Sequence, residues 1–214
     1  SRIGVGETDS LRSQAIDAVL SNGDSQRLRT LVHLLTKGEA TRSVGRLIHE
    51  AVDGLYDLFT QTEQGAWEAV PQSKPLDARQ LADTLDELRR CALSDKRQAR
   101  ARDEDYDRAI AGDWDDFLAK GLAAKVAAGE TSYYRKPIPA EAAACYTRLI
   151  AHVRAVLVGR LALQTKATYE LLQLFDEQYQ RLKDDHRVLR FEDVTRRLGA
   201  RPDAVNERAL SFRL

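Results

Sequence analysis

The sequence predicts an all-α protein that contains one very long helix in its C-terminal third. Three observations indicate this fold class. Apolar residues recur at helical spacing along most of the chain. Glycine and proline are scarce, with 12 and 5 among 214 residues, whereas turn-rich β proteins need many of both. Residues 140–185 contain no proline and a single glycine. A hydrophobic content of 43% is enough to form a buried core.

Three helices and one shorter helical piece are expected in the first third of the chain. Apolar residues are spaced by three and four positions within residues 10–20, 28–35 and 41–59, as on one face of an α-helix. Trp67 lies on a short helical piece that comes before Pro71. Proline interrupts a helix because it lacks the backbone N–H group.

The middle of the chain alternates between amphipathic and highly charged segments. Residues 76–93 predict a helix, and residues 114–126 predict another that Gly129 ends. Between them, residues 94–116 have few apolar side chains, so we expect either an exposed helix or a mobile crossing. Residues 132–139 form the one segment that is clearly non-helical, and no convincing strand is predicted anywhere.

The stretch from residue 140 to residue 185 predicts one continuous helix. Its apolar stripe advances by threes and fours, with one gap near Gln164. At about 1.5 Å per residue such a helix is roughly 69 Å long, so we expect it to extend from one sub-region into another. Short helices are expected after it, at residues 189–198 and 202–210.

Charge and cysteine usage restrict the class of protein. The 33 basic and 33 acidic residues balance, which argues against a polybasic protein but leaves a local basic patch possible. No run of about 18 apolar residues is present, and the N-terminus lacks the apolar core of a signal peptide. We therefore expect no membrane span and a cytoplasmic location. Cys91 and Cys145 are then expected to be buried free thiols.

The motifs of common catalytic sites are missing from this sequence. Gly4 and Gly6 are not followed by the lysine of a P-loop, and His49-Glu50 lacks the second histidine of the metalloprotease motif because Asp53 stands there. We expect no catalytic residue, no metal ligand and no cofactor in this chain.

Carboxylates between residues 103 and 116 allow one alternative, an enzyme that holds Mg²⁺. Basic residues come immediately before them. We therefore favour a solvated helix face whose charges neutralise one another.

Two segments have the composition of a nucleic-acid contact. Tyr133, Tyr134, Arg135 and Lys136 combine aromatic rings for base stacking with cations for phosphate contact. The alternative is that these tyrosines pack the loop onto neighbouring helices.

Arg97 and Arg100 belong to the second segment, a short basic run that also includes Lys96 and Arg102. Its cations could follow a phosphate backbone or simply form a solvated face.

The last third of the chain resembles a known family. The segment from Tyr169 to Asp176, then Tyr179, Lys183 and residues 189–194, is similar to a stretch of the UvrD-like superfamily 1 DNA helicases. In that family a long helix with a tyrosine and a lysine near its end leads into an apolar-Asp-Phe-Asp-Asp-Leu element.

The match to that element departs from the family at one position. Arg190 stands where the family has the first acid, whereas Phe191, Glu192 and Asp193 match the next three positions. The closing residues 209–214 resemble the segment that precedes the Walker B strand in the RecB/AddA branch.

The resemblance implies that the chain is an internal piece of a longer helicase. Residues 1–132 would be the helical accessory subdomain called 1B, residues 133–186 a loop and the long connecting helix, and residues 187–214 the returning segment of the motor domain. The absence of methionine fits this expectation. The family residues Tyr179, Lys183, Phe191, Glu192 and Asp193 would then be mainly structural.

The function that the resemblance implies is that of a DNA-binding accessory region in an ATP-dependent DNA helicase and exonuclease. Such enzymes, of the exonuclease V kind, serve DNA unwinding, double-strand-break repair and recombination. The expected partners are DNA, the remainder of the motor and a second helicase–nuclease subunit. ATP and Mg²⁺ would bind in the parent protein, and this piece alone would be inactive because P-loop and Walker B lie outside it. The alternative is a free-standing α-helical protein–protein interaction module without catalysis.

Overall fold

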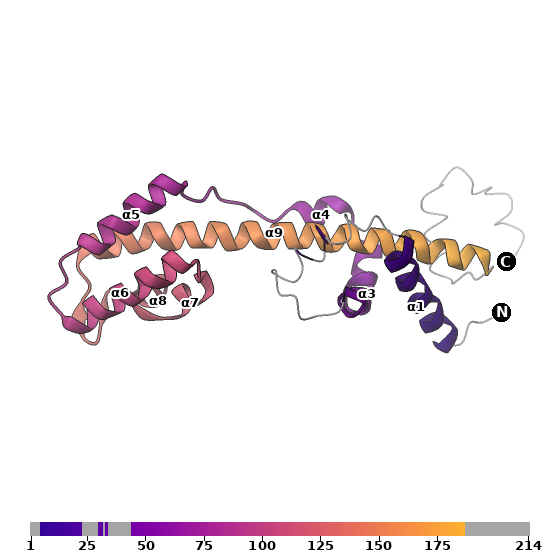
Figure 1. Cartoon of the computed structure of the whole chain (residues 1–214), viewed down its shortest axis with the longest axis horizontal. Helices are drawn as coiled ribbons and strands as arrows, with labels where there is room; N and C mark the ends of the chain where they lie inside the picture. Colours follow the sequence, from indigo (N-terminus) through magenta and orange to yellow (C-terminus); the bar gives the residue numbers. More distant parts are fainter. Residues whose placement is uncertain (1–4, 23–29, 32, 34–43, 187–214) are drawn as a thin grey trace, which may run out of the picture. The chain divides into compact units, whose positions relative to one another are not determined.

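The computed structural model describes residues 5–22, 30–31, 33 and 44–186, and these are predominantly helical (Figure 1). The prediction of an all-α fold with one very long helix is confirmed. The elements in chain order are α1 (Val5–Asn22), α3 (Val44–Gln61), α4 (Gln64–Glu68), α5 (Ala78–Arg90), α6 (Lys96–Ala111), α7 (Trp114–Ala119), α8 (Gly121–Ala127), β1 (Ser132–Tyr133), β2 (Lys136–Pro137) and α9 (Ala140–Asp185). The helices expected at 189–198 and 202–210, and most of the one at 28–35, lie outside the described residues.

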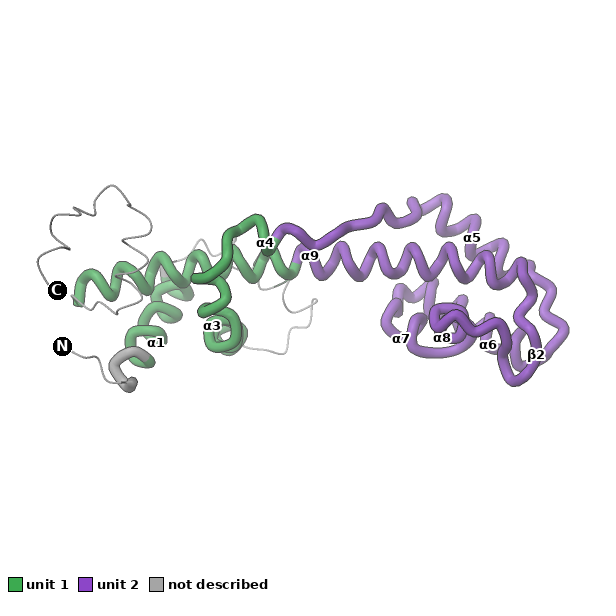
Figure 2. Tube along the Cα trace, turned by 180° about the vertical axis from the view of Figure 1, so that it is seen from behind, with its two compact units in different colours: residues 1–67, 164–214 green, residues 68–163 purple. Residues whose placement is uncertain are grey.

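The chain forms two compact units, and α9 contributes to both (Figure 2). Unit 1 comprises residues 1–67 and 164–214, and unit 2 comprises residues 68–163. The boundary within α9 falls at Gln164, where the apolar stripe of the sequence has its gap. The helicase resemblance predicts a different division, at residues 132 and 186, because it assigns segments of this chain to the domains of a helicase. That assignment stays a prediction.

Unit 1 packs aromatic rings of α3 and α4 against the second half of α9. Phe175 lies edge-on to Tyr56 at 5.0 Å between ring centroids and stacks on Tyr179 at 5.4 Å. The Tyr56 hydroxyl donates a hydrogen bond of 2.6 Å to Asp176, so the polar end of this ring is satisfied at the edge of the core. Trp67 of α4 contacts the ring of Tyr169 in α9 at 5.8 Å between centroids.

A buried carboxylate joins three helices in unit 2. Asp105 of α6 is 0% exposed, and its Oδ2 atom accepts the backbone N–H groups of Leu122 and Ala123 at 2.9 and 3.1 Å. The Tyr146 hydroxyl of α9 donates to the same oxygen at 3.0 Å, while Arg108 donates to Oδ1 at 2.7 Å. Burial raises the pKa of this carboxyl, although each of the four donors favours the charged form. Asp105 thereby caps α8 and attaches it to α6 and α9.

The prediction of a single helix over residues 114–126 is wrong, because the chain breaks into α7 and α8. Gly121 has a φ of +67°, and a Cβ atom there would lie 2.1 Å from Oδ1 of Asp105. Only glycine allows the backbone to approach the carboxylate this closely. The apolar pattern alone runs through the break, so periodicity could not reveal it.

Residues 94–116 and 132–139 also differ in detail from what the sequence led us to expect. The first segment contains a regular helix, α6, which buries Gln98, Ala101, Asp105 and Ala109 on one face. Of the two alternatives for this segment, the helix is therefore correct, but one face of it is buried. The second segment contains a small antiparallel hairpin, in which Ser132 pairs with Pro137 and Tyr133 with Lys136.

Helix α9 satisfies simple criteria for a membrane-spanning segment, which the sequence analysis had not anticipated. An 18-residue window of it has a mean hydropathy of 1.2, and 44% of that window is buried inside the structure. Core helices of water-soluble proteins meet the same criteria, and α9 buries side chains in both cores, such as Leu149 and Leu171.

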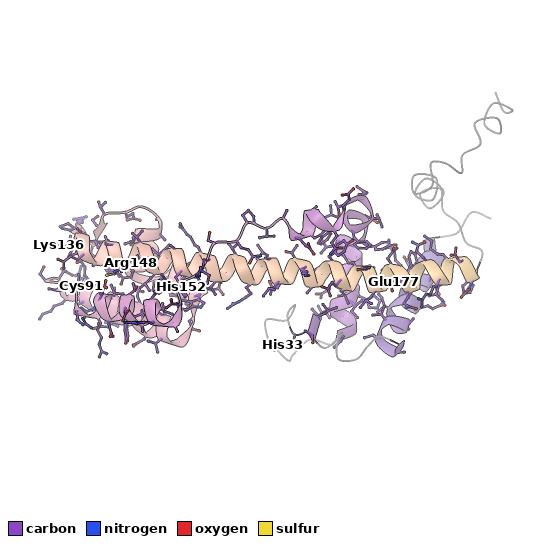
Figure 3. All side chains as sticks on the ribbon, turned by 90° about the horizontal axis from the view of Figure 1, so that it is seen from above. His33, Cys91, Lys136, Arg148, His152 and Glu177 are labelled. Atoms are coloured by element: carbon purple, nitrogen blue, oxygen red, sulfur yellow. The ribbon has the colours of Figure 1, made fainter. Side chains whose placement is uncertain are left out.

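His152 of α9 attaches the segment before α5 to the core of unit 2 (Figure 3). Its Nδ1 atom accepts the backbone N–H of Leu76 at 3.0 Å, and Trp114 packs edge-on against the imidazole at 5.4 Å. Burial lowers the pKa of this histidine below 6.5, so the neutral form is favoured. Only a neutral imidazole has a nitrogen lone pair that can accept this bond.

We predict that replacing Gly121 is far more costly than replacing Gly112. Both glycines have positive φ, +67° and +75°, but nothing lies within 4 Å of a Cβ atom added at Gly112. Gly112→Ala should therefore cost only the strain of a left-handed residue, about 1–2 kcal/mol. Gly121→Ala should cost about 3 kcal/mol or more, since it also displaces a buried, hydrogen-bonded charge. Urea denaturation of both variants measures the difference, and equal losses would contradict the capping role of Asp105.

We also predict that His152 makes stability depend on pH. Below pH 6.5 the unfolded chain binds a proton at this residue that the folded chain resists, because the folded pKa is lowered. The contribution is complete above about pH 6.5 and decreases as the pH falls, by at most about 1.4 kcal/mol per pH unit. Denaturation from pH 5 to pH 8 measures it, with His152→Gln as the non-titrating control. A variant with the same pH slope as the wild type would contradict the assignment.

Candidate nucleic-acid interface

The β1–β2 hairpin of unit 2 has an unusual turn. Its two turn residues, Tyr134 and Arg135, both lie in the left-handed region with φ of 47° and 64°. Two positive φ values are typical of a type I′ turn, in which asparagine and glycine are strongly preferred. Side chains other than these are strained there by about 1–2 kcal/mol per residue. The turn therefore contains a bulky ring and a cation at two positions where asparagine or glycine would be more stable.

Gln98 of α6 attaches the hairpin to the helical part of unit 2. This side chain is 2% exposed, and its Nε2 atom donates to the backbone carbonyls of Lys136 and Pro137 at 3.2 and 3.0 Å. Asp95 caps the same end of α6 by accepting the N–H groups of Arg97 and Gln98 at 2.9 and 3.2 Å. The start of α6 and the second strand are thereby held together.

The two tyrosines of the hairpin have different environments. Tyr133 is half-buried against the core of unit 2, and burial raises the pKa of its hydroxyl. Tyr134 is 64% exposed, and the two rings meet edge-on at 4.8 Å. The guanidinium of Arg97 lies 5.0 Å from the centroid of the Tyr134 ring, which is within the range of a cation–π contact.

Two clefts lie on the surface beside these rings, and both tyrosines line each of them. The smaller, of about 490 Å³, is completed by Arg97, Arg100, Ala101 and Glu104 of α6. The larger, of about 640 Å³, lies over α7 and α8 and includes Lys120, Lys125 and Glu130. Both volumes are in the range of small-ligand sites.

The cations around the clefts differ in whether a carboxylate neutralises them. Arg100 pairs with Glu104 at 2.9 Å, Lys120 with Asp116 at 2.6 Å, and Lys125 with Glu130 at 3.0 Å. Within the part of the chain that the structure describes, no ion pair involves Arg97, Arg135 or Lys136. These three charges remain available for an anion.

The structure brings the two predicted nucleic-acid segments together. We call Arg97, Arg100, Tyr133, Tyr134, Arg135 and Lys136 the hairpin site. Four of these residues line the smaller cleft, while Arg135 and Lys136 are exposed in the hairpin itself. Sequence reasoning missed Gln98, which attaches the hairpin, and the lysines of the larger cleft. A usable signal was present for Gln98, since it stands three residues before Ala101 on the face that buries Ala101, Asp105 and Ala109.

The family residues of the C-terminal third do not form part of this site. Tyr179 is buried in unit 1, and the ammonium of Lys183, itself 4% exposed, lies 4.8 Å from the centroid of the Tyr179 ring. Both side chains are therefore packed inside unit 1, and their role in the family motif stays a prediction. Phe191, Glu192 and Asp193 lie outside the described residues.

No group of three or more histidine, cysteine or acidic side chains with metal-binding geometry occurs among the described residues. The acidic segment 103–116 is instead divided between a buried cap, Asp105, and surface ion pairs such as Glu104 with Arg100.

Comparison of the chain with protein-family models, with curated protein sequences and with solved structures gave no match.

We predict that Arg135→Gly stabilises the chain. Glycine adopts positive φ without strain, so the replacement should raise the free energy of unfolding by about 1 kcal/mol. Chemical denaturation measures this gain. Arg135→Ala is the matched control, since it removes the same side chain and keeps the strain. If both variants have the stability of the wild type, the turn is not strained.

Proposed function

We propose that unit 2 binds DNA through the hairpin site, as the accessory region of a RecB/AddA-like ATP-dependent DNA helicase and exonuclease. The observation that carries the proposal is the grouping of exposed Tyr134 with Arg97, Arg135 and Lys136, three cations that have no ion pair among the described residues. Rings and cations in one cleft are what single-stranded nucleic acid needs, since bases stack and phosphates pair. The helicase part of the proposal rests on the sequence resemblance in the C-terminal third.

The cations have distinct roles in this proposal. Arg135 and Lys136 extend from the hairpin into solvent and make the phosphate contacts. Arg97 lies over the Tyr134 ring at 5.0 Å, so it orients the ring and presents a charge to the phosphate of a base stacked there. Arg100 contributes less, because its ion pair with Glu104 must first be broken.

Binding by this chain is expected to be weak and sensitive to salt. The formal net charge is zero, so the chain as a whole does not attract DNA over long distances. Only the local charges act, and they are screened beyond about 10 Å at 0.1 M salt. ATP and Mg²⁺ belong, in this proposal, to the parent motor, where they would drive strand separation while unit 2 holds the DNA.

We predict that Arg135→Ala combined with Lys136→Ala lowers the salt dependence of DNA binding. Losing two phosphate contacts should reduce the slope of log affinity against log salt by up to about two on duplex DNA. Fluorescence anisotropy at several salt concentrations measures the slope. The control is Arg79→Ala with Arg90→Ala, which removes the same charge from two exposed, ion-paired positions of α5. If both double variants change the slope equally, the hairpin is not a specific contact.

Tyr134 is predicted to act by stacking and not by charge. Tyr134→Ala should weaken binding to a single-stranded oligonucleotide by about 1–3 kcal/mol and leave the salt slope nearly unchanged. Tyr134→Trp is the matched control, because it keeps an aromatic face and should retain the affinity. Unchanged affinity in the alanine variant would show that the ring makes no contact with a base.

The alternative function, a free-standing α-helical interaction module, is favoured by one observation. Leu161 and Leu163 of α9 are 53% and 56% exposed, which is high for leucine and suits contact with a protein partner. If the chain binds neither single-stranded nor duplex DNA at low salt, this alternative becomes the better proposal.

A further inference from the structure

The larger cleft of unit 2, of about 640 Å³, has no part in the phosphate contacts assigned above. It is lined by Ala124 of α8, by the C-cap residue Ala128 and by the rings of Tyr133 and Tyr134. Helix α8 packs against both α6 and β1, so the alanines and the rings belong to neighbouring elements. Methyl groups and aromatic rings suit a flat group such as a nucleobase better than they suit a phosphate.

A hydrogen-bond donor and an acceptor stand together in the same cleft. Nζ of Lys125 lies 3.0 Å from Oε1 of Glu130, and both residues line the cleft. The turn that ends α8 fixes their spacing, because the backbone N–H of Glu130 donates to the carbonyl of Lys125 at 2.9 Å and Gly129 has a φ of +78°. An ammonium and a carboxylate side by side match the edge of a nucleobase, which has acceptors and donors.

Tyr134 lines both clefts, whereas Arg97 lines the smaller one and not the larger one. The guanidinium of Arg97 lies 5.0 Å from the centroid of the Tyr134 ring, so it leaves the larger cleft open. Tyr133 is half-buried and meets the Tyr134 ring edge-on at 4.8 Å, which helps to hold that ring in place. One exposed ring thus stands between a cleft suited to a base and a cation suited to a phosphate.

We propose that the larger cleft is a subsite for one unpaired nucleobase of single-stranded DNA. The base stacks on Tyr134, its edge exchanges hydrogen bonds with Lys125 and Glu130, and its phosphate meets Arg97. The inference rests on the proposed function and narrows it, because it names the single strand as the form of DNA that the hairpin site prefers.

Duplex DNA fits this subsite poorly. Its bases are stacked within the helix and their Watson–Crick edges are already paired, so a base enters the cleft only after it has been flipped out, which costs free energy. The phosphate contacts of Arg135 and Lys136 need no such step, since both forms of DNA expose their backbone. The preference for a single strand is therefore due to the base and not to the phosphates.

The experiment measures binding of the full chain to three labelled probes of equal length at low salt, by fluorescence anisotropy. The probes are a single strand of mixed sequence, the duplex of that sequence and a strand whose sugars carry no bases. The abasic strand keeps the phosphates and removes all stacking. We expect the normal single strand to bind about tenfold more tightly than either of the other probes, which is the effect of one stacked base.

A cleft-filling variant places the base in the larger cleft. Ala124→Leu combined with Ala128→Leu narrows that cleft and keeps every ring and charge of the hairpin site. It should weaken single-strand binding about tenfold and leave the duplex, the abasic strand and the salt slope unchanged. The matched control is Ala78→Leu with Ala82→Leu, which adds the same side chains at the same spacing on exposed positions of α5 and should bind as the wild type does.

Two results would overturn the inference while the phosphate contacts of the proposed function stand. In one, the abasic strand binds as tightly as the normal strand. In the other, the cleft-filling variant binds the single strand as tightly as the wild type does. If none of the probes binds, the inference and the proposed function fail together. Should the double variant not fold, Ala128→Leu alone, at an exposed position, provides the same test.

Discussion

The carboxylate of Asp105 is the interaction on which most of unit 2 depends. It accepts from Arg108 in its own helix, from two backbone amides that begin α8 and from Tyr146 in α9. A buried charge is tolerated only when its hydrogen-bonding capacity is satisfied, so these donors must stay in place for the unit to fold. The hairpin follows α8 and precedes α9 in the chain. Its position therefore depends on a group that takes no part in binding.

Helix α6 combines this structural role with the candidate binding role on two different faces. Its buried face contains Gln98 and Asp105, and each of them attaches another segment, the hairpin and α8 respectively. Its outer face presents Arg97 and Arg100 to the smaller cleft. This division explains how a helix with so little apolar surface is stable: buried hydrogen bonds replace part of the hydrophobic contact. The same bonds keep the strained Tyr134–Arg135 turn from relaxing.

The sequence predicted the parts of the fold that depend on local periodicity. Helix α9 was predictable because its apolar stripe is regular. The boundary between the units coincides with the gap in that stripe near Gln164, but no boundary was predicted there. The break between α7 and α8 was not, because it depends on Asp105, which is distant in sequence from Gly121. The hairpin was missed because strands of two residues are too short to show alternation. Its turn lacks the asparagine and glycine that normally mark such turns.

The candidate site was predictable in its residue types but not in its arrangement. Rings and cations at 133–136 are visible in the sequence, whereas the approach of Arg97 to Tyr134 depends on how α6 packs. The sequence nevertheless indicates which cations have an acid one helical turn away and which do not. Arg100 has an acid four residues later, and Lys120 has one four residues earlier, a spacing that favours the ion pairs that the structure shows.

Four residues after Arg97 stands Ala101, which carries no charge, and Arg135 and Lys136 lie in the hairpin, where this helical rule does not apply. The zero net charge of the chain thus conceals an uneven distribution. Cations such as Arg100 and Lys120 pair with an acid one helical turn away. Among the described cations without an ion pair, Arg97 lies over the exposed Tyr134 ring, and Arg135 and Lys136 follow that ring in the hairpin. A neutral protein can therefore carry a local anion-binding surface, and the spacing of its charges indicates where that surface lies.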